Sequence, residues 1–178
     1  EKVKKAKSNP RLVKNLLCKE FNIRETSGEA WLTYEQANNT EIFDVAELKP
    51  RYAIGGCDLS STTDLTAAKL IFKFTGNNKI YVLQMYWMPE DSLQTRIDED
   101  KIPYDVWVDR GFIRLCRGNK INYKDVTAWF VEMQEKHDIY LLYCGYDGRS
   151  AEYWVNEMEE YFGDTAMAKV IQGKKTLS

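Results

Sequence analysis

Two aspartates, Asp58 and Asp147, each end an apolar run that is long enough to form a strand. The first run covers residues 52–57 and the second covers residues 140–146. A carboxylate at the end of a buried strand costs free energy unless it is paired or binds a cation. Two such strands, if adjacent in one sheet, place their carboxylates side by side. The pattern therefore predicts a divalent-metal site for phosphate chemistry at Asp58 and Asp147.

Small and polar residues surround both aspartates. Glycines precede each of them, and glycine lets another backbone or a ligand approach closely. The hydroxyls at 60–63, Ser60 first, suit hydrogen bonds to a carboxylate or a phosphate. Asp64 is expected to support the metal ligands or to be a turn residue, and Arg149 to reach a phosphate or to be a surface cation. Taken singly, Asp58 also fits a turn or helix-cap residue that closes a strand.

Composition places the chain among ordinary globular proteins. It has 178 residues, of which 44% are hydrophobic and 29% are charged, enough for one domain with a core. No apolar run approaches the ~20 residues that a transmembrane helix needs, and no signal peptide is evident. The four cysteines have no metal-ligand spacing and are expected to be reduced. A net charge of −2 argues neither for nor against nucleic acid.

The apolar patterns predict an α/β fold with a mixed sheet. Three consecutive strands joined by short loops are expected to form an antiparallel meander, and the alternating helices and strands that follow are expected to add parallel strands. The run from Ile139 to Tyr146 is continuous and apolar, which predicts a central parallel strand. The expected strands are residues 51–58, 65–74, 79–88, 112–116, 139–146 and 168–171, and the main helices begin near residue 90 and cover 103–110, 123–136 and 151–162.

A domain boundary is expected at Pro50, where the strand-rich pattern begins. Residues 1–49 are predicted to form a connector or arm with a helical segment at 10–22, whose apolar residues share one face, and a short helical piece near Trp31. Residues 50–178 are predicted to form the second domain.

Four motifs, in order, resemble the nuclease domain of the large terminase subunit of tailed bacteriophages. The resemblance covers the chain from about Ala53 to its end, and the upstream LLCKEFNI and EAWL are similar to the connector that follows that family's ATPase domain. The motifs are GGCDLSSTTDLTA, IPYDVWVDRGFIRLCRGNKINY, YCGYDGRSA and VIQGKKTLS.

The resemblance implies a ribonuclease H-like fold and a metal-dependent endonuclease that cuts concatemeric double-stranded DNA during DNA packaging. By position, Asp58 matches the first catalytic aspartate and Asp147 the second metal ligand, with Mg²⁺ or Mn²⁺ as cofactor. The family's third carboxylate lies on a helix after the motif that is here Gln172-Gly173, and no residue matches it. The motor motif GxxxxGK[ST] is also absent. We therefore expect a C-terminally truncated nuclease domain that cuts DNA poorly or not at all.

The same resemblance implies partners and a location. The expected partners are double-stranded DNA, the terminase ATPase domain, the small terminase subunit and the portal. The expected location is the cytoplasm of an infected or lysogenic bacterial host, with no membrane association.

Two other functions fit the residues. An actin-like or sugar-kinase-like ATP-binding domain also opens with a strand and a small-residue loop that holds an aspartate. It needs a repeated half-domain, and no internal repeat is present. A non-catalytic interaction module with an incomplete site is the other alternative.

Overall fold

The computed structural model divides into two units, Glu1–Phe43 and Asp44–Ser178. It describes residues 38–60, 64–147 and 151–171. In the first unit, the described residues 38–43 form neither helix nor strand. The predicted helix at 10–22 and the predicted helical piece near Trp31 lie outside the described residues. All that follows concerns the second unit, in which no described helix is long and apolar enough to span a membrane.

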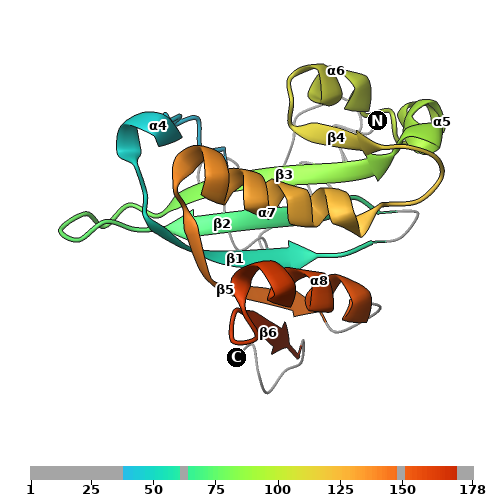
Figure 1. Ribbon diagram of the computed structural model, residues 1–178. Helices are drawn as coiled ribbons and strands as arrows, with labels where there is room; N and C mark the ends of the chain where they lie inside the picture. The colour runs from blue at the N-terminus through green and yellow to red at the C-terminus, as the bar shows by residue number, and fades with distance from the viewer. Residues whose placement is uncertain (1–37, 61–63, 148–150, 172–178) are drawn as a thin grey trace, which may run out of the picture. The chain divides into compact units, whose positions relative to one another are not determined.

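The second unit is built on a six-stranded mixed sheet with the order β4-β3-β2-β1-β5-β6 (Figure 1). The first three strands pair antiparallel, and the remaining pairs, β3–β4, β1–β5 and β5–β6, are parallel. This confirms the predicted α/β mixed sheet. The strands are β1 (Tyr52–Asp58), β2 (Thr66–Phe72), β3 (Tyr81–Pro89), β4 (Ile113–Cys116), β5 (Tyr140–Asp147) and β6 (Met167–Val170).

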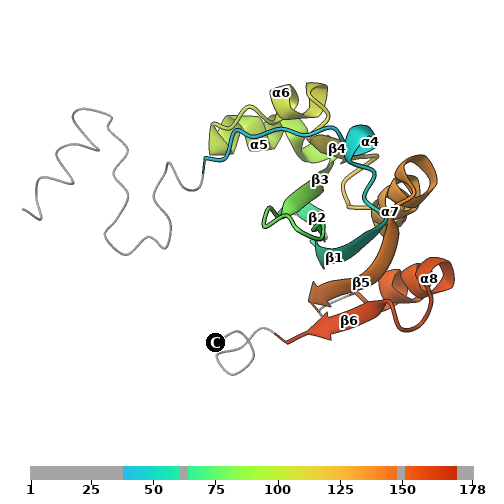
Figure 2. The same cartoon turned by 90° about the vertical axis from the view of Figure 1, so that its left-hand side faces the viewer.

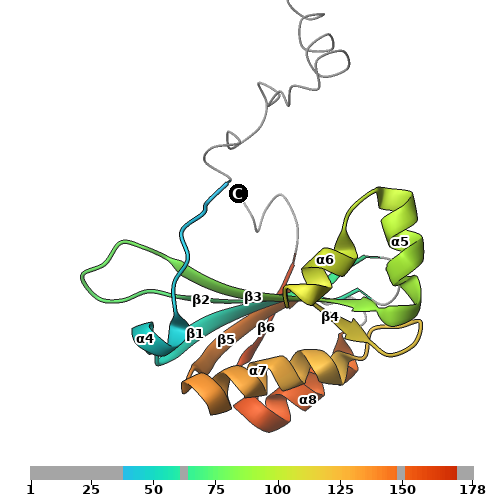
Figure 3. The same ribbon diagram turned by 90° about the horizontal axis from the view of Figure 1, so that it is seen from above.

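Helices lie on both faces of the sheet but cover different parts of it (Figures 2 and 3). The two longest, α7 (Tyr123–His137) and α8 (Glu152–Phe162), lie on one face, which we call the helix face. The shorter α5 (Leu93–Asp100) and α6 (Tyr104–Asp109) lie on the opposite face near β3 and β4. We call this opposite face the open face. No described helix covers it over β1 and β5.

The main core lies between the helix face and the two long helices. Apolar residues at helical spacing on α7 are buried, as their pattern predicts. Trp87 of β3 packs edge-on against Trp129 of α7, with ring centroids 6.1 Å apart. Tyr146 of β5 contacts Trp154 of α8 in the same way at 6.3 Å. These contacts hold α7 and α8 against the sheet.

Two expectations about the elements were wrong or incomplete. The apolar run of β5 predicted a central parallel strand. It is parallel to both of its neighbours, β1 and β6, but it lies next to the edge strand, and Tyr140 and Tyr143 are exposed because no described helix covers them. The short helix α4 (Val45–Leu48) was not predicted. It begins at Asp44, whose carboxylate accepts a hydrogen bond from the Ala46 N–H, and such a single turn has no apolar periodicity to reveal it.

Most remaining boundaries differ from prediction by one or two residues. The segment after β3 begins with a 3₁₀ turn, η1 (Glu90–Ser92), before α5.

Candidate active site

The structure brings Asp58 and Asp147 together at the carboxyl ends of adjacent parallel strands. The register pairs Gly56 with Gly145 and Cys57 with Tyr146, so the next position along each strand aligns the two aspartates. Neighbouring strands lie about 4.8 Å apart. The two carboxylates therefore extend from neighbouring backbones, as the sequence predicted.

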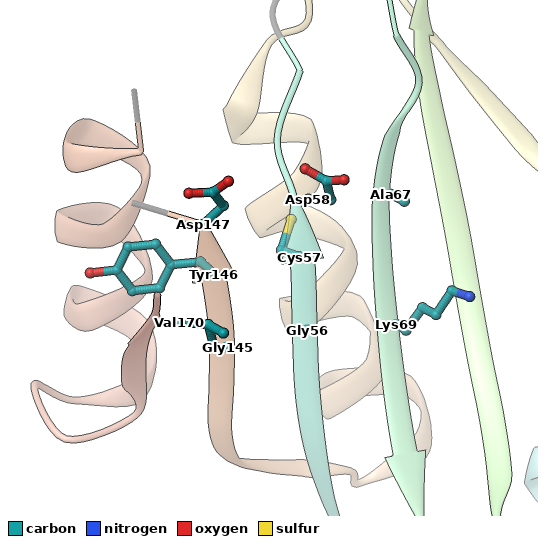
Figure 4. Close-up of a pocket in the computed structure, with 9 residues that line it drawn as sticks. All are labelled: Gly56, Cys57, Asp58, Ala67, Lys69, Gly145, Tyr146, Asp147 and Val170. Atoms are coloured by element: carbon teal, nitrogen blue, oxygen red, sulfur yellow. The ribbon is translucent and has the colours of Figure 1, made fainter. Parts of the chain in front are cut away.

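Both carboxylates belong to the open face. Cys57 is buried against the helix face and Tyr146 contacts Trp154 there, so the residues after them point the other way. Figure 4 shows both aspartate side chains on one side of the sheet, at the strand ends. Asp58 is exposed and Asp147 is half-buried.

A β-bulge determines the face on which Asp147 lies. Ala53 pairs with Leu141, but the next residue of β1, Ile54, pairs with Tyr143, so Leu142 is an extra residue in β5. Side chains alternate along a strand, and one inserted residue reverses the alternation beyond it. Without the bulge, Asp147 would lie on the helix face, away from Asp58.

The aspartates border a shallow depression of about 340 Å³ on the open face. Gly56 and Gly145, which lie side by side, have no side chains to fill it. A methyl group at Gly56 would meet no atom within 4 Å, and one at Gly145 would meet Val170 at 3.1 Å. The depression is lined by Gly56, Cys57, Asp58, Ala67, Lys69, Gly145, Tyr146, Asp147 and Val170.

The loop after β1 is attached to the start of β2 by a buried hydroxyl. Thr66 Oγ accepts a hydrogen bond from the Ser60 N–H at 2.9 Å and donates one to the Ser60 carbonyl at 3.0 Å. Neither Ser60 nor Asp64 lines the depression, and Asp64 is exposed. Arg149 lies outside the described residues. The supporting or DNA-contacting roles of these three residues stay predictions.

The charge of Asp58 acts on the thiol beside it. Burial raises the pKa of Cys57 well above its ordinary value, and the neighbouring Cys144 and Asp58 raise it further. Burial also raises the pKa of Cys144, to about 12. Both thiols are free and protonated at neutral pH, so they are poor nucleophiles there.

Among the described residues that line the depression, the charged oxygen donors are the two carboxylates of Asp58 and Asp147. Carboxylate oxygens are the ligands that Mg²⁺ and Mn²⁺ prefer. Among the residues that the structure describes, no group of three or more His, Cys, Asp or Glu side chains is placed to hold a metal ion. The chemistry of these two donors fits a divalent cation.

Sequence reasoning missed Lys69, the cation among the described lining residues. It lies directly opposite Gly56 on β2. The only available signal was the alternation of side chains along β2, and that becomes informative only when the register against β1 is known.

Comparison with known proteins agrees with this arrangement. A family model for the endonuclease domain of the terminase large subunit matches residues 1–178. The terminase large subunit of Enterobacteria phage HK97 is 34% identical over 91 residues, which are 51% of this chain and 18% of that protein. The solved structure of the HK97 bacteriophage large terminase aligns with a TM-score of 0.60 and 27% identity. That alignment covers 71% of this chain and 26% of the solved one.

The chain thus spans about a fifth to a quarter of the length of these relatives. The structural likeness confirms that the mixed sheet is ribonuclease H-like. Because the family model matches the whole chain, the chain belongs to the family of terminase large-subunit endonuclease domains.

Proposed function

We propose that this chain is a metal-dependent DNA endonuclease domain that cuts concatemeric double-stranded DNA during viral packaging by two-metal phosphodiester hydrolysis. Asp58 and Asp147 are its catalytic metal ligands. The observation that carries the proposal is their alignment on adjacent parallel strands, on one face of the sheet, beside a depression whose base is glycine. Family membership favours this function over ATP binding.

Asp58 and Asp147 are the residues that would hold Mg²⁺ or Mn²⁺. When bound, such cations supply activation of water and stabilisation of charge on the leaving 3′-oxygen. The two carboxylates provide the negative charge that attracts the cations. Gly56 and Gly145 leave room for a phosphodiester to approach the strand ends, because neither has a side chain above the sheet.

No side-chain nucleophile is required by this chemistry, and the described residues around the depression offer none. His137, the single histidine of the sequence, is the last residue of α7 and does not line the depression. The aspartates themselves repel the DNA backbone until a cation neutralises them. DNA affinity should therefore depend on the divalent cation and fall with salt.

The remaining parts of the proposal extend to the longer protein. Residues 1–49 serve as the connector and residues 50–178 as the nuclease domain. The partners are the ATPase domain, the small terminase subunit and the portal, in the cytoplasm of an infected or lysogenic bacterium. Two carboxylates balance only part of the charge of two divalent cations, so this chain alone should cut weakly.

Mn²⁺ binding tests the site directly. The parent chain should bind Mn²⁺ in a calorimetric titration, and Asp58→Asn and Asp147→Asn should each weaken binding by roughly tenfold or more, since each removes half of the carboxylate charge. Asp109→Asn is the matched control, because Asp109 is an exposed aspartate at the end of α6 and outside the depression. Equal Mn²⁺ affinity in Asp58→Asn and the parent would contradict the proposal.

Nicking of supercoiled plasmid in Mn²⁺ tests the activity. Slow nicking by the parent and by Asp109→Asn, with none by Asp147→Asn, is the expected result. Mn²⁺ binding at the aspartates without nicking, even by a chain extended past Ser178, would instead favour the non-catalytic interaction module.

A further inference from the structure

Two rows of residues cross the open face beside the aspartates. In the first, Gly56 of β1 pairs with Lys69 of β2, which pairs with Gln84 of β3. In the second, Asp58 pairs with Ala67, which pairs with Tyr86. Directly paired residues project from the same face of a sheet. Lys69, Gln84 and Tyr86 therefore form a polar strip that starts one strand away from Asp58.

Lys69 is unpaired on this face. Within the described part of the chain its ammonium group has no hydrogen bond or ion pair, although two carboxylates border the same depression. Figure 4 shows its side chain leading away from β1 and the aspartates, toward the neighbouring strand. That neighbour is β3. Its ammonium group is thus available to an anion that lies over β2 and β3.

Gln84 is oriented by Tyr86. The Tyr86 hydroxyl donates a hydrogen bond to Gln84 Oε1 at 3.1 Å. The ring of Tyr86 packs against the cluster of Met88, Tyr104 and Ile113 beneath α5 and α6, which holds the hydroxyl in place. Because Oε1 is the acceptor, the amide Nε2 retains its N–H donors for a ligand. The exposed Gln84 therefore adds neutral donors next to the charge of Lys69.

We propose that Lys69 and Gln84 bind a backbone phosphate of the cleaved DNA strand, next to the phosphodiester held at Asp58 and Asp147. The proposal rests on the proposed nuclease function. Strands about 4.8 Å apart place β2 and β3 some 5 to 10 Å from β1. Successive phosphates of one strand rise by about 3.4 Å along the helix axis and lie further apart than that through space, so this span matches the phosphate next to the cleaved one. Lysine binds phosphate as a point charge with three donors.

The strip also indicates on which side of the aspartates the bound DNA strand continues across the sheet. On the other side of the aspartates, β6 contributes the apolar Val170 to the depression. The phosphate next to the cleavage point is therefore bound on the β2 side. Lys69 and Gln84 are positioning residues in this arrangement, since neither is placed at the reacting atoms.

Salt-dependent DNA binding is the direct test. Binding of a short labelled duplex is measured in Ca²⁺ across a range of salt concentrations, with cleavage monitored in parallel. Lys69→Ala should raise the Kd by roughly fivefold to tenfold. It should also lower the slope of log affinity against log salt by about 0.9, the value for one lost phosphate contact. Lys69→Arg should keep most of the parent's DNA affinity and most of its salt slope. Gln84→Ala should raise the Kd by a smaller factor and leave the slope unchanged, because it removes no charge.

The matched control is Lys169→Ala. Lys169 is an exposed lysine on β6 that pairs with Tyr146 and so belongs to the helix face. The Lys169→Ala variant should keep the parent's Kd for DNA and the parent's slope of log affinity against log salt. In nicking assays, Lys69→Ala should raise the KM and leave kcat within about twofold, as expected of a residue that binds substrate equally in ground and transition states.

The outcomes separate this proposal from the function on which it rests. If the parent binds Mn²⁺ and nicks DNA while Lys69→Ala keeps the parent's Kd and salt slope, the phosphate contact is wrong and the nuclease function stands. A fall in Mn²⁺ affinity and kcat in Lys69→Ala, with unchanged KM, would also overturn it, since the lysine would then act on the metal site. If Asp58→Asn binds Mn²⁺ as tightly as the parent, the nuclease function fails and this proposal fails with it.

Discussion

Gly55 and Gly56 are adjacent residues with opposite surroundings. They project to opposite faces of the sheet. A methyl group at Gly55 would lie 2.9 Å from Leu141 Cδ1, 3.1 Å from Cys144 Sγ and 3.2 Å from Phe130 Cε1. A methyl group at Gly56 would meet nothing within 4 Å. The first glycine therefore permits close packing in the core, and the second leaves the depression open.

This difference predicts opposite effects of one substitution. Gly55→Ala should lower the free energy of unfolding by about 1–3 kcal/mol, because it overpacks a filled core. Gly56→Ala should leave stability unchanged or slightly higher, since alanine reduces the freedom of the unfolded chain. Urea denaturation of both variants measures this. Equal destabilisation of the two variants would show that the faces are misassigned.

At the scale of elements, Glu132 of α7 connects its helix to strand β4. Its carboxylate forms ion pairs of 2.8 Å with Lys136, one turn along α7, and with Arg114 of β4. Arg114 pairs with Trp87 in the sheet, and Trp87 itself packs on α7, so both side chains belong to the helix face. The hydrogen bond from Lys136, together with Arg114, holds the pKa of Glu132 below its ordinary value.

The pKa of Glu132 is lower in the folded state than in the unfolded state. Its ionised carboxylate therefore adds to the free energy of unfolding above the unfolded-state pKa of about 4.3, and this addition is lost as pH falls through the folded-state pKa. Glu132→Gln should therefore lower the free energy of unfolding at pH 7 by less than about 1 kcal/mol, as for other partly exposed pairs. The difference from the parent should shrink as the solution is acidified below pH ~4. The control is Glu135→Gln, since Glu135 is an exposed glutamate on the same helix. This variant should keep the parent's free energy of unfolding at pH 7 and its dependence on pH. A deficit in Glu132→Gln that grew on acidification would contradict this account.

At the scale of the whole unit, the sheet has one buried face and one that is exposed over β1 and β5. Cys57 and Cys144 lie on the buried face, at 7% and 0% exposure. Burial is the main cause of their raised pKa values. Tyr52, Ile54 and Tyr143 lie on the other face and are about half exposed. The thiols are therefore accessible to reagents only when this packing opens.

Raised thiol pKa values make stability depend on alkaline pH. The folded state keeps Cys144 protonated until about pH 12, whereas an unfolded thiol ionises near pH 8.5. The protonated thiol contributes its full share of the folding stability below pH ~8.5, and this share is lost as pH rises toward the folded-state pKa. The free energy of unfolding should therefore fall between pH 8 and pH 10. Cys144→Ala should show a shallower fall.

Alkylation of Cys57 and Cys144, followed by mass spectrometry, should proceed only as fast as the unit unfolds, and rapid labelling in the native state would disprove their burial.

The sequence by itself determined the order of strands and helices and the two aspartates. These follow from local patterns, since an apolar run that ends in aspartate or an apolar face at helical spacing is visible without knowing what it packs against. The motifs around Asp58 and Asp147 also carried the family resemblance, which the match over residues 1–178 confirmed.

The tertiary structure decided how these residues combine. The face on which Asp147 lies depends on Leu142, the extra residue in β5, and a bulge is defined only by the pairing of two strands. The polar strip of Lys69 and Gln84 depends on the register of β2 against β1 and β3, which brings together residues from three segments. The exposure of Tyr140 and Tyr143 depends on where the helices pack. Alternation along a strand tells which residues share a face, but only long-range pairing tells which face that is and what lies beside it.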